Sequence, residues 1–214
     1  MILHLVTDRT RLSDQVAFPE IRRCLLLQVQ QAVAARVDYV QIRERDLEAL
    51  DLAVLTTDAV RLTRGTHTRV LVNDRLDVAL ACGADGVHLR ADSVAVRAAR
   101  AMTPDGFLIG RSVHSELEAA AAADADYLIA GTVWPSDSKP EGHPVLGLDG
   151  FAAIVRAVTV PVLAIGGVTV DRVRDVAAAG GAGIAAIGLF LDPRRTAGCR
   201  AVPVTQIADA VRAV

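Results

Sequence analysis

Three cationic side chains lie in polar segments that follow apolar stretches, where they could bind an anion. Arg43 and Arg45 directly follow one such stretch, and Lys139, the only lysine of the chain, lies in a long polar segment. Arginine holds carboxylate or phosphate oxygens through two parallel hydrogen bonds, whereas lysine is a compact point charge on a mobile stem. These residues predict an anionic substrate, although Lys139 also fits an exposed surface position.

Two aspartates supply the hard oxygen ligands that a magnesium site needs. The pair Asn73-Asp74 ends one apolar stretch, and Asp92 follows the next. Mg²⁺ is commonly held by one or two carboxylates together with substrate phosphates. The pattern predicts a Mg²⁺ site at Asp74 with Asp92 as a second ligand. Asp74 could also cap the helix that follows it, and the two roles are compatible.

Glycines follow the last two apolar stretches, at Gly166-Gly167 and at Gly188. Glycine lets backbone N–H groups approach an anion closely, and barrel enzymes often bind phosphate after their seventh and eighth strands. These glycines predict a phosphate site; tight turns are the alternative. Among the histidines, His88 and His114 fit packed, hydrogen-bonded positions, whereas His143 is either a surface residue or a general base.

The elements that must position these residues alternate along the whole chain. Short Val-, Ile- and Leu-rich stretches alternate with longer segments of helical period, which is typical of a parallel sheet built from βα units. Strands are expected at Ile2–Val6, Tyr39–Arg43, Arg69–Asn73, Gly86–Leu89, Phe107–Arg111, Tyr127–Gly131, Val162–Gly166 and Ile184–Gly188. Helices are expected near 20–36, 46–63, 75–82, 93–102, 115–123, 149–158, 170–179 and 203–213.

Eight such units predict a single (β/α)8 TIM barrel over residues 1–214. The alternative is an open doubly wound sheet, but Thr7-Asp8-Arg9 after the first strand lacks the glycines of a dinucleotide site. In a barrel the C-terminal ends of the strands carry the active site. Gln41, Arg43, Asn73 and Ser112 all fall at or near such ends, and the segment from Trp134 to Leu148 is expected to be a binding loop.

Composition narrows the classes of partner. The 214 residues carry a formal charge of −2, which gives no support to nucleic-acid or membrane-surface binding. No apolar run reaches the length of a membrane span, and the N-terminus reads as a strand rather than a signal peptide. Three widely spaced cysteines fit a reduced, cytoplasmic protein. A small phosphorylated metabolite is the expected partner, and homo-oligomer formation stays open.

Several motifs, in order along the chain, resemble the thiamin phosphate synthase family. They are Thr7-Asp8, Gln41-Ile42-Arg43-Glu44, Leu71-Val72-Asn73-Asp74, Gly83-Ala84-Asp85-Gly86-Val87-His88-Leu89, Gly110-Arg111-Ser112-Val113-His114-Ser115, Ala125-Asp126-Tyr127, Lys139, and Pro161-Val162-Leu163-Ala164-Ile165-Gly166-Gly167-Val168. The resemblance implies a (β/α)8 barrel that joins hydroxymethylpyrimidine diphosphate to thiazole phosphate and releases pyrophosphate. It also implies that Arg43, Asn73 and Lys139 hold the diphosphate, that Asp74 holds Mg²⁺, and that Gly167 helps to hold the thiazole phosphate.

Departures from the family pattern leave two alternatives open. The family usually has a lysine at Arg45, an acidic metal ligand at Ser93 and a serine at Gly188. The segments Ile42–Arg45 and Ile109–Ser115 look more like the TenI-like thiazole tautomerases, which isomerise carboxythiazole phosphate without Mg²⁺. That branch has a histidine where this chain has Thr132. The second alternative is a non-catalytic barrel that binds thiazole phosphate or thiamin phosphate.

Overall fold

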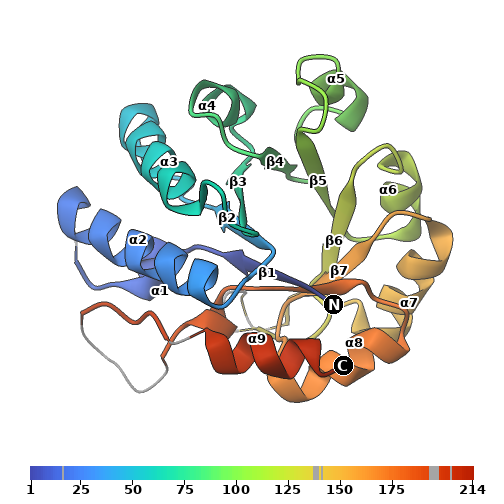
Figure 1. Ribbon diagram of the computed structural model, residues 1–214. Helices are drawn as coiled ribbons and strands as arrows, with labels where there is room; N and C mark the ends of the chain where they lie inside the picture. The colour runs from blue at the N-terminus through green and yellow to red at the C-terminus, as the bar shows by residue number, and fades with distance from the viewer. Residues whose placement is uncertain (16, 137–139, 141, 193–197, 203) are drawn as a thin grey trace.

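A computed structural model describes residues 1–15, 17–136, 140, 142–192, 198–202 and 204–214. Eight parallel strands close into a barrel in sequence order, with β1 paired to both β2 and β8, so the predicted TIM barrel is confirmed (Figure 1). The strands are β1 (Ile2–Val6), β2 (Tyr39–Ile42), β3 (Arg69–Asn73), β4 (Gly86–Leu89), β5 (Leu108–Val113), β6 (Tyr127–Gly131), β7 (Val162–Ile165) and β8 (Gly183–Ala186).

Helices surround the barrel on the outside (Figure 1). They are α1 (Arg9–Leu12), α2 (Phe18–Ala34), α3 (Ala49–Thr63), α4 (Leu76–Ala81), α5 (Val96–Arg100), α6 (Glu116–Ala121), α7 (Gly147–Ala157), α8 (Val173–Ala178) and α9 (Thr205–Arg212). Short 3-10 turns η1 (Val170–Arg172) and η2 (Gly188–Phe190) follow β7 and β8. Every expected helix is present, but α1 was not predicted.

The strand bounds follow the apolar stretches to within two residues, and β5 and β8 depart most from the prediction. β5 begins one residue later than predicted and continues two residues further, to Val113, because Ser112 and Val113 pair with β6. β8 begins earlier, at Gly183, and ends before Gly188, which instead opens η2. The predicted extent of β8 was therefore wrong at both ends.

The barrel interior holds a small aliphatic and aromatic cluster. Its buried members are Val6, Leu71, Tyr127, Ile129, Leu163 and Ala185. A larger core fills the space between the strands and the helices. The strands are therefore buried on both faces, which explains why some of them are apolar throughout. In β6, for example, all five residues are buried.

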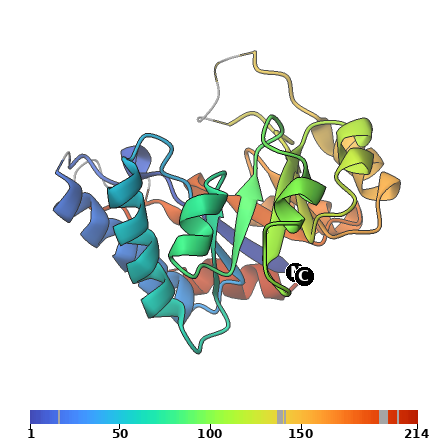
Figure 2. The same cartoon turned by 90° about the horizontal axis from the view of Figure 1, so that it is seen from above.

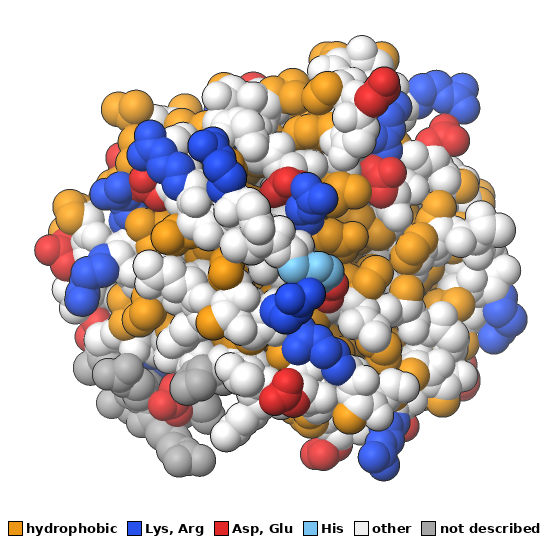
Figure 3. All heavy atoms as spheres, viewed as in Figure 1, with side chains coloured by type: hydrophobic (Ala, Val, Ile, Leu, Met, Phe, Trp, Pro, Cys, Tyr) orange, Lys and Arg blue, Asp and Glu red, His pale blue; other side chains and the backbone are white. Residues whose placement is uncertain are grey.

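The two ends of the barrel differ. Figure 2 shows the described parts of the connection between β6 and α7 projecting at the end away from both termini. The face with the termini carries basic and acidic side chains interspersed across its centre and its rim (Figure 3). Ion pairs there include Arg69–Asp85 at 2.9 Å and Arg100–Asp126 at 2.6 Å. Within the described residues, no helix combines the length and apolar character needed to cross a bilayer.

Candidate active site

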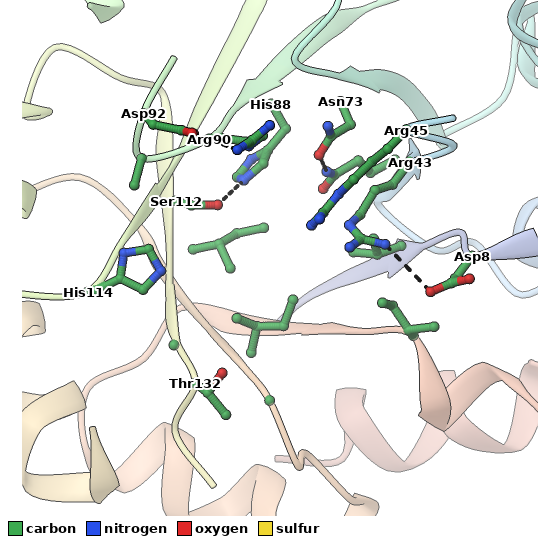
Figure 4. Close-up of a pocket in the computed structure, with 18 residues that line it drawn as sticks. Asp8, Arg43, Arg45, Asn73, His88, Arg90, Asp92, Ser112, His114 and Thr132 are labelled. Atoms are coloured by element: carbon green, nitrogen blue, oxygen red, sulfur yellow. Dashed lines mark hydrogen bonds and ion pairs between the residues drawn. The ribbon is translucent and has the colours of Figure 1, made fainter. Parts of the chain in front are cut away.

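A cavity of about 430 Å³ opens at the C-terminal ends of the strands (Figure 4). Polar side chains from β2 to β5 line one side of it, and Gly131, Thr132, Ile165, Gly166 and Ile187 line the other. The polar residues are Asp8, Gln41, Arg43, Arg45, Asn73, His88, Arg90, Asp92, Ser112 and His114. The polar residues expected at the C-terminal ends of the strands thus line a cavity.

Arg43 and Arg45 extend into this cavity from the end of β2 (Figure 4). The Arg43 guanidinium lies 3.6 Å from the Asp8 carboxylate, and its backbone N–H donates to the Thr7 hydroxyl at 2.9 Å. Burial, together with the neighbouring Arg45 charge, lowers the pKa of Arg43 from its usual value. Two guanidinium groups in a half-enclosed space favour an anion, because a ligand of opposite charge relieves their mutual repulsion.

Glu44 turns away from the cavity and fixes the loop that carries Arg43. Its carboxylate accepts from the Thr7 hydroxyl at 2.6 Å and from the Arg9 backbone N–H at 3.0 Å. The side chain is buried, and loss of hydration raises its pKa to about 7, although the bond from Thr7 opposes the shift. Glu44 therefore joins β1, α1 and the end of β2.

Ser112 is oriented from below by a buried histidine. His88 Nε2 lies 2.8 Å from Ser112 Oγ (Figure 4). On the other side of the ring, His88 Nδ1 lies 3.0 Å from the Tyr127 hydroxyl. Burial lowers the pKa of His88 well below its usual value and raises the pKa of Tyr127, so the imidazole and the phenol are both neutral. We assign the phenol as the donor to Nδ1, because among the described residues the Tyr127 hydroxyl has no other hydrogen-bond partner; the ring proton then lies on Nε2, and the Ser112 hydroxyl hydrogen is free to point into the cavity.

Two further residues continue this polar floor. Gln41 Nε2 donates to Asn73 Oδ1 at 2.9 Å, which joins the ends of β2 and β3. Beneath them, His4 is fully buried against the rings of Tyr39, Tyr127 and His88. Burial lowers the pKa of His4 to about 3. The floor of the cavity is therefore polar but uncharged.

The two candidate metal ligands lie on either side of an arginine. Arg90 contacts the Asp92 carboxylate at 2.6 Å and the Asp74 carboxylate at 3.9 Å, and the Ser93 hydroxyl donates to Asp74. Asp92 borders the main cavity, whereas Asp74 lines a neighbouring surface pocket. Carboxylate and hydroxyl oxygens are suitable Mg²⁺ donors. The Arg90 side chain, which is 44% exposed, occupies the space between the two carboxylates, and the described residues contain no group of three or more His, Cys, Asp or Glu side chains that could hold a metal ion.

A second compartment of about 510 Å³ adjoins the first and shares Ile165, Gly166 and Ile187 with it. It is lined by the turns after β7 and β8, including all three predicted phosphate glycines, and by Arg11 and Arg200. Gly166 and Gly167 have φ values of 95° and 62°. A Cβ at Gly167 would overlap the Pro135 carbonyl oxygen, so this glycine is also required by the close approach of the β6–α7 connection.

The predicted loop residues do not join either compartment in the described part of the chain. Lys139 lies outside the described residues. His143 is exposed, and its backbone N–H donates to the Pro140 carbonyl at 3.1 Å. Within the described segments, His143 does not line the cavity, whereas His114 does. Arg172 stacks over the Trp134 ring at 5.0 Å and holds the start of the connection.

Four polar residues around the two compartments were not singled out by sequence. Arg90 and Arg11 follow strand ends, as Arg43 does, so position relative to the strands could have indicated them. Tyr127 begins β6 and reaches His88 only through the closed barrel. Arg200 lies far from every strand end in the sequence and enters the second compartment through the C-terminal segment.

Residues 3–190 match the family described as thiamine monophosphate synthase. The chain belongs to this family. It is 44% identical to the thiamine-phosphate synthase of Methanoregula boonei over 73% of each chain. It is 36% identical to that of Pyrococcus horikoshii, over 88% of this chain and 86% of the other.

Solved structures agree with the family assignment. Thiamine phosphate pyrophosphorylase from Pyrococcus furiosus has a TM-score of 0.78 at 31% identity, covering 99% of this chain and 94% of that one. A 3-hexulose-6-phosphate synthase, at 20% identity and a TM-score of 0.68, shares the fold. This member of the thiamine monophosphate synthase family thus has a cavity with arginine side chains on one side and glycines on the other.

Proposed function

We propose that this chain is a thiamin phosphate synthase. It joins hydroxymethylpyrimidine diphosphate to thiazole phosphate and releases pyrophosphate. The observation that carries the proposal is the pair of adjoining compartments in a member of this family. One holds Arg43 and Arg45 and suits a diphosphate; the other holds the glycine turns and suits a phosphate monoester.

The reaction proceeds by departure of the leaving group first. The bond between the pyrimidine methylene carbon and the diphosphate oxygen breaks, and its electron pair leaves with pyrophosphate. The thiazole nitrogen then donates its lone pair to the methylene carbon. The protein's tasks are to hold the two substrates in line and to stabilise the charge of the departing group.

Arg43 and Arg45 bind the diphosphate, and Lys139 contributes a further charge from the β6–α7 connection. The Ser112 hydroxyl, held by His88 at 2.8 Å, donates to an oxygen of the same group. Gln41 and Asn73 hold the end of the substrate nearest the barrel axis, supported by their mutual hydrogen bond of 2.9 Å. Gly166, Gly167 and Gly188 surround the thiazole phosphate.

Mg²⁺ is the proposed cofactor, held by Asp74 with Asp92. When bound, it neutralises charge on the diphosphate oxygens. The proposed setting is the cytoplasm, in keeping with three free cysteines within the described residues. A tautomerase activity has less support, because Thr132 offers no titratable ring and its side chain lies against Gly166.

The test is to supply both substrates with Mg²⁺ and to measure pyrophosphate release together with thiamin phosphate formation. Wild-type protein should form both products in equal amounts, and EDTA should abolish them. Arg43→Ala should lose most activity. Arg97→Ala removes the same charge from an 88% exposed side chain and is the matched control. Isomerisation of carboxythiazole phosphate without any coupling would contradict the proposal.

The β6–α7 connection needs its own comparison. Lys139→Ala should reduce pyrophosphate release, with thiazole phosphate affinity little changed, because only the diphosphate loses a cation. His143→Ala should leave coupling intact, since His143 is exposed. Loss of thiazole isomerisation in His143→Ala, with coupling absent in wild type, would favour the tautomerase instead. If neither substitution alters either activity, the loop residues are not catalytic.

A further inference from the structure

The second compartment lies where the first and last strands of the barrel meet. It is bordered by the turns after β7 and β8, by Arg11 in α1, and by Arg200 in the segment before α9. The glycine turns supply no charge of their own. The compartment therefore has two cationic side chains whose role in binding has yet to be explained.

Arg11 is placed directly against Gly188. A Cβ at Gly188 would stand 3.5 Å from Arg11 Nη2 and 3.8 Å from Nη1, and no closer to any other group. The absence of a side chain at Gly188 thus leaves one edge of the guanidinium open to the compartment. Among the described residues, Arg11 forms no ion pair with a carboxylate, so its charge is available to a ligand.

Arg200 is engaged differently. Its backbone N–H donates to the Leu12 carbonyl at 2.8 Å, and its carbonyl accepts from the Asp192 N–H at 2.7 Å. Its guanidinium donates to the carbonyl oxygens of Arg11 and Asp192, both at 3.4 Å. Arg200 therefore ties the C-terminal segment to the end of α1, and two of its five guanidinium N–H donors are used in doing so.

We propose that Arg11 binds the phosphate group of the thiazole substrate, opposite the glycine turns. This rests on the proposed function, which places thiazole phosphate in the second compartment. A guanidinium presents two parallel N–H donors to a phosphate and keeps its charge at every working pH. Backbone N–H groups alone would bind the anion without neutralising it. Arg11 supplies the positive charge that the glycine turns lack.

The experiment measures binding of thiazole phosphate by calorimetry, with the dephosphorylated thiazole alcohol as a second ligand. Arg11→Ala should raise the Kd for thiazole phosphate about tenfold or more, since a charge-assisted hydrogen bond pair is lost. Arg11→Lys should fall between Arg11→Ala and wild type. The Kd for the alcohol should be the same in all three. Arg97→Ala, which also removes one surface charge, should bind both ligands as wild type does.

A second pair of variants tests the same contact while Arg11 is kept. Gly188→Asp places a carboxylate beside the guanidinium and should abolish phosphate binding, because the internal ion pair replaces the ligand. Gly188→Ala adds a methyl at ordinary contact distance and should lose much less affinity than Gly188→Asp. Thermal unfolding of each variant verifies that it is folded.

The outcomes separate this inference from the proposed function. Wild-type Kd for thiazole phosphate in Arg11→Ala would overturn the role of Arg11, whatever the enzyme's activity. Failure of wild type to bind thiazole phosphate, with inorganic phosphate still bound in an Arg11-dependent manner, would sink the proposed substrate and uphold the phosphate contact. Failure of wild type to bind either anion would overturn the contact.

Discussion

At the scale of single residues, the positive charge of Arg90 partly offsets the two carboxylate charges of the candidate metal site. Its guanidinium lies between Asp74 and Asp92 and already neutralises part of the charge that would attract Mg²⁺. The ion and the guanidinium compete for the same oxygens. Binding of Mg²⁺ therefore includes the cost of displacing a partly exposed ion pair, which is worth up to about 1 kcal/mol.

Arg90→Ala should consequently bind Mg²⁺ about two- to fivefold more tightly than wild type, as measured by calorimetry without substrates. Asp74→Asn should weaken Mg²⁺ binding in both backgrounds. Arg97→Ala controls for the loss of one positive charge. Weaker Mg²⁺ binding in Arg90→Ala would show that the arginine supports the site rather than competes with it.

Tyr127 acts on Ser112 through His88, and Tyr127→Phe removes the single hydroxyl that selects the tautomer. The variant leaves His88 Nδ1 buried without its donor, which should cost about 1–3 kcal/mol in the free energy of unfolding. It should also lower kcat. The nitrogen-15 resonances of His88 should show a protonated Nε2 in wild type and a mixture of tautomers in the variant.

Tyr39→Phe is the matched control, since Tyr39 stacks on Tyr127 at 5.4 Å between ring centroids without contacting His88. It should leave the His88 resonances unchanged. Unaltered nitrogen-15 shifts in Tyr127→Phe would refute the tautomer assignment.

Glu44 joins three elements: β1 through Thr7, α1 through the Arg9 N–H, and the end of β2 through its own backbone. Its pKa is raised to about 7 in the folded chain. The folded state therefore binds a proton that the unfolded chain releases near pH 4.5. Because the folded state holds more protons in this window, the free energy of unfolding falls as pH rises from about 4.5 to 7, by about 3 kcal/mol from this group.

Glu44→Gln should flatten that slope, as measured by urea denaturation at several pH values. Arg9→Lys keeps the backbone donor and should retain the wild-type slope. A slope that persists unchanged in Glu44→Gln would assign the titration to another group.

At the scale of elements, the sequence best predicted those strands whose apolar stretch has a clear beginning and a clear end. The bounds of β1, β3, β4 and β6 follow from apolar stretches alone. β5 was predicted to end at Arg111 because Ser112 and the residues after it look like a loop, although Ser112 and Val113 pair with β6. Ser112, near its polar end, lines the cavity, and strand pairing there extends beyond the apolar pattern.

The site could be predicted only where each residue follows its own strand. Gln41, Arg43, Asn73 and Ser112 were found in this way, and all four line the cavity. Contacts across strands leave no local signal. The bridge from Arg90 to Asp74, the bond from Tyr127 to His88, and the bond from Arg200 to Leu12 each join different elements of the chain.

At the scale of the whole molecule, two neutral histidines sit inside the barrel. Burial lowers the pKa of His4 to about 3 and that of His88 well below its usual value. The unfolded chain takes up these protons near pH 6.5, whereas the folded chain does not. Stability contributed by the two groups is therefore present above pH 6.5 and is lost as pH falls toward 3.

Urea denaturation from pH 7 to 4 should show the acid destabilisation, and His4→Leu should reduce it. Glu44 acts in the opposite direction over part of this range, so the double variant with Glu44→Gln separates the two contributions. An unchanged acid limb in His4→Leu would contradict the assignment to His4.

The contact between α1 and the segment before α9 has a consequence for the order in which the second compartment forms during synthesis. Arg11 is synthesised well before Arg200, whose backbone N–H donates to the Leu12 carbonyl at the end of α1. A nascent chain can therefore pair β1 through β7 and still lack a finished phosphate compartment. Under the proposed function, thiazole phosphate is therefore expected to stabilise only those chains that already include residue 200.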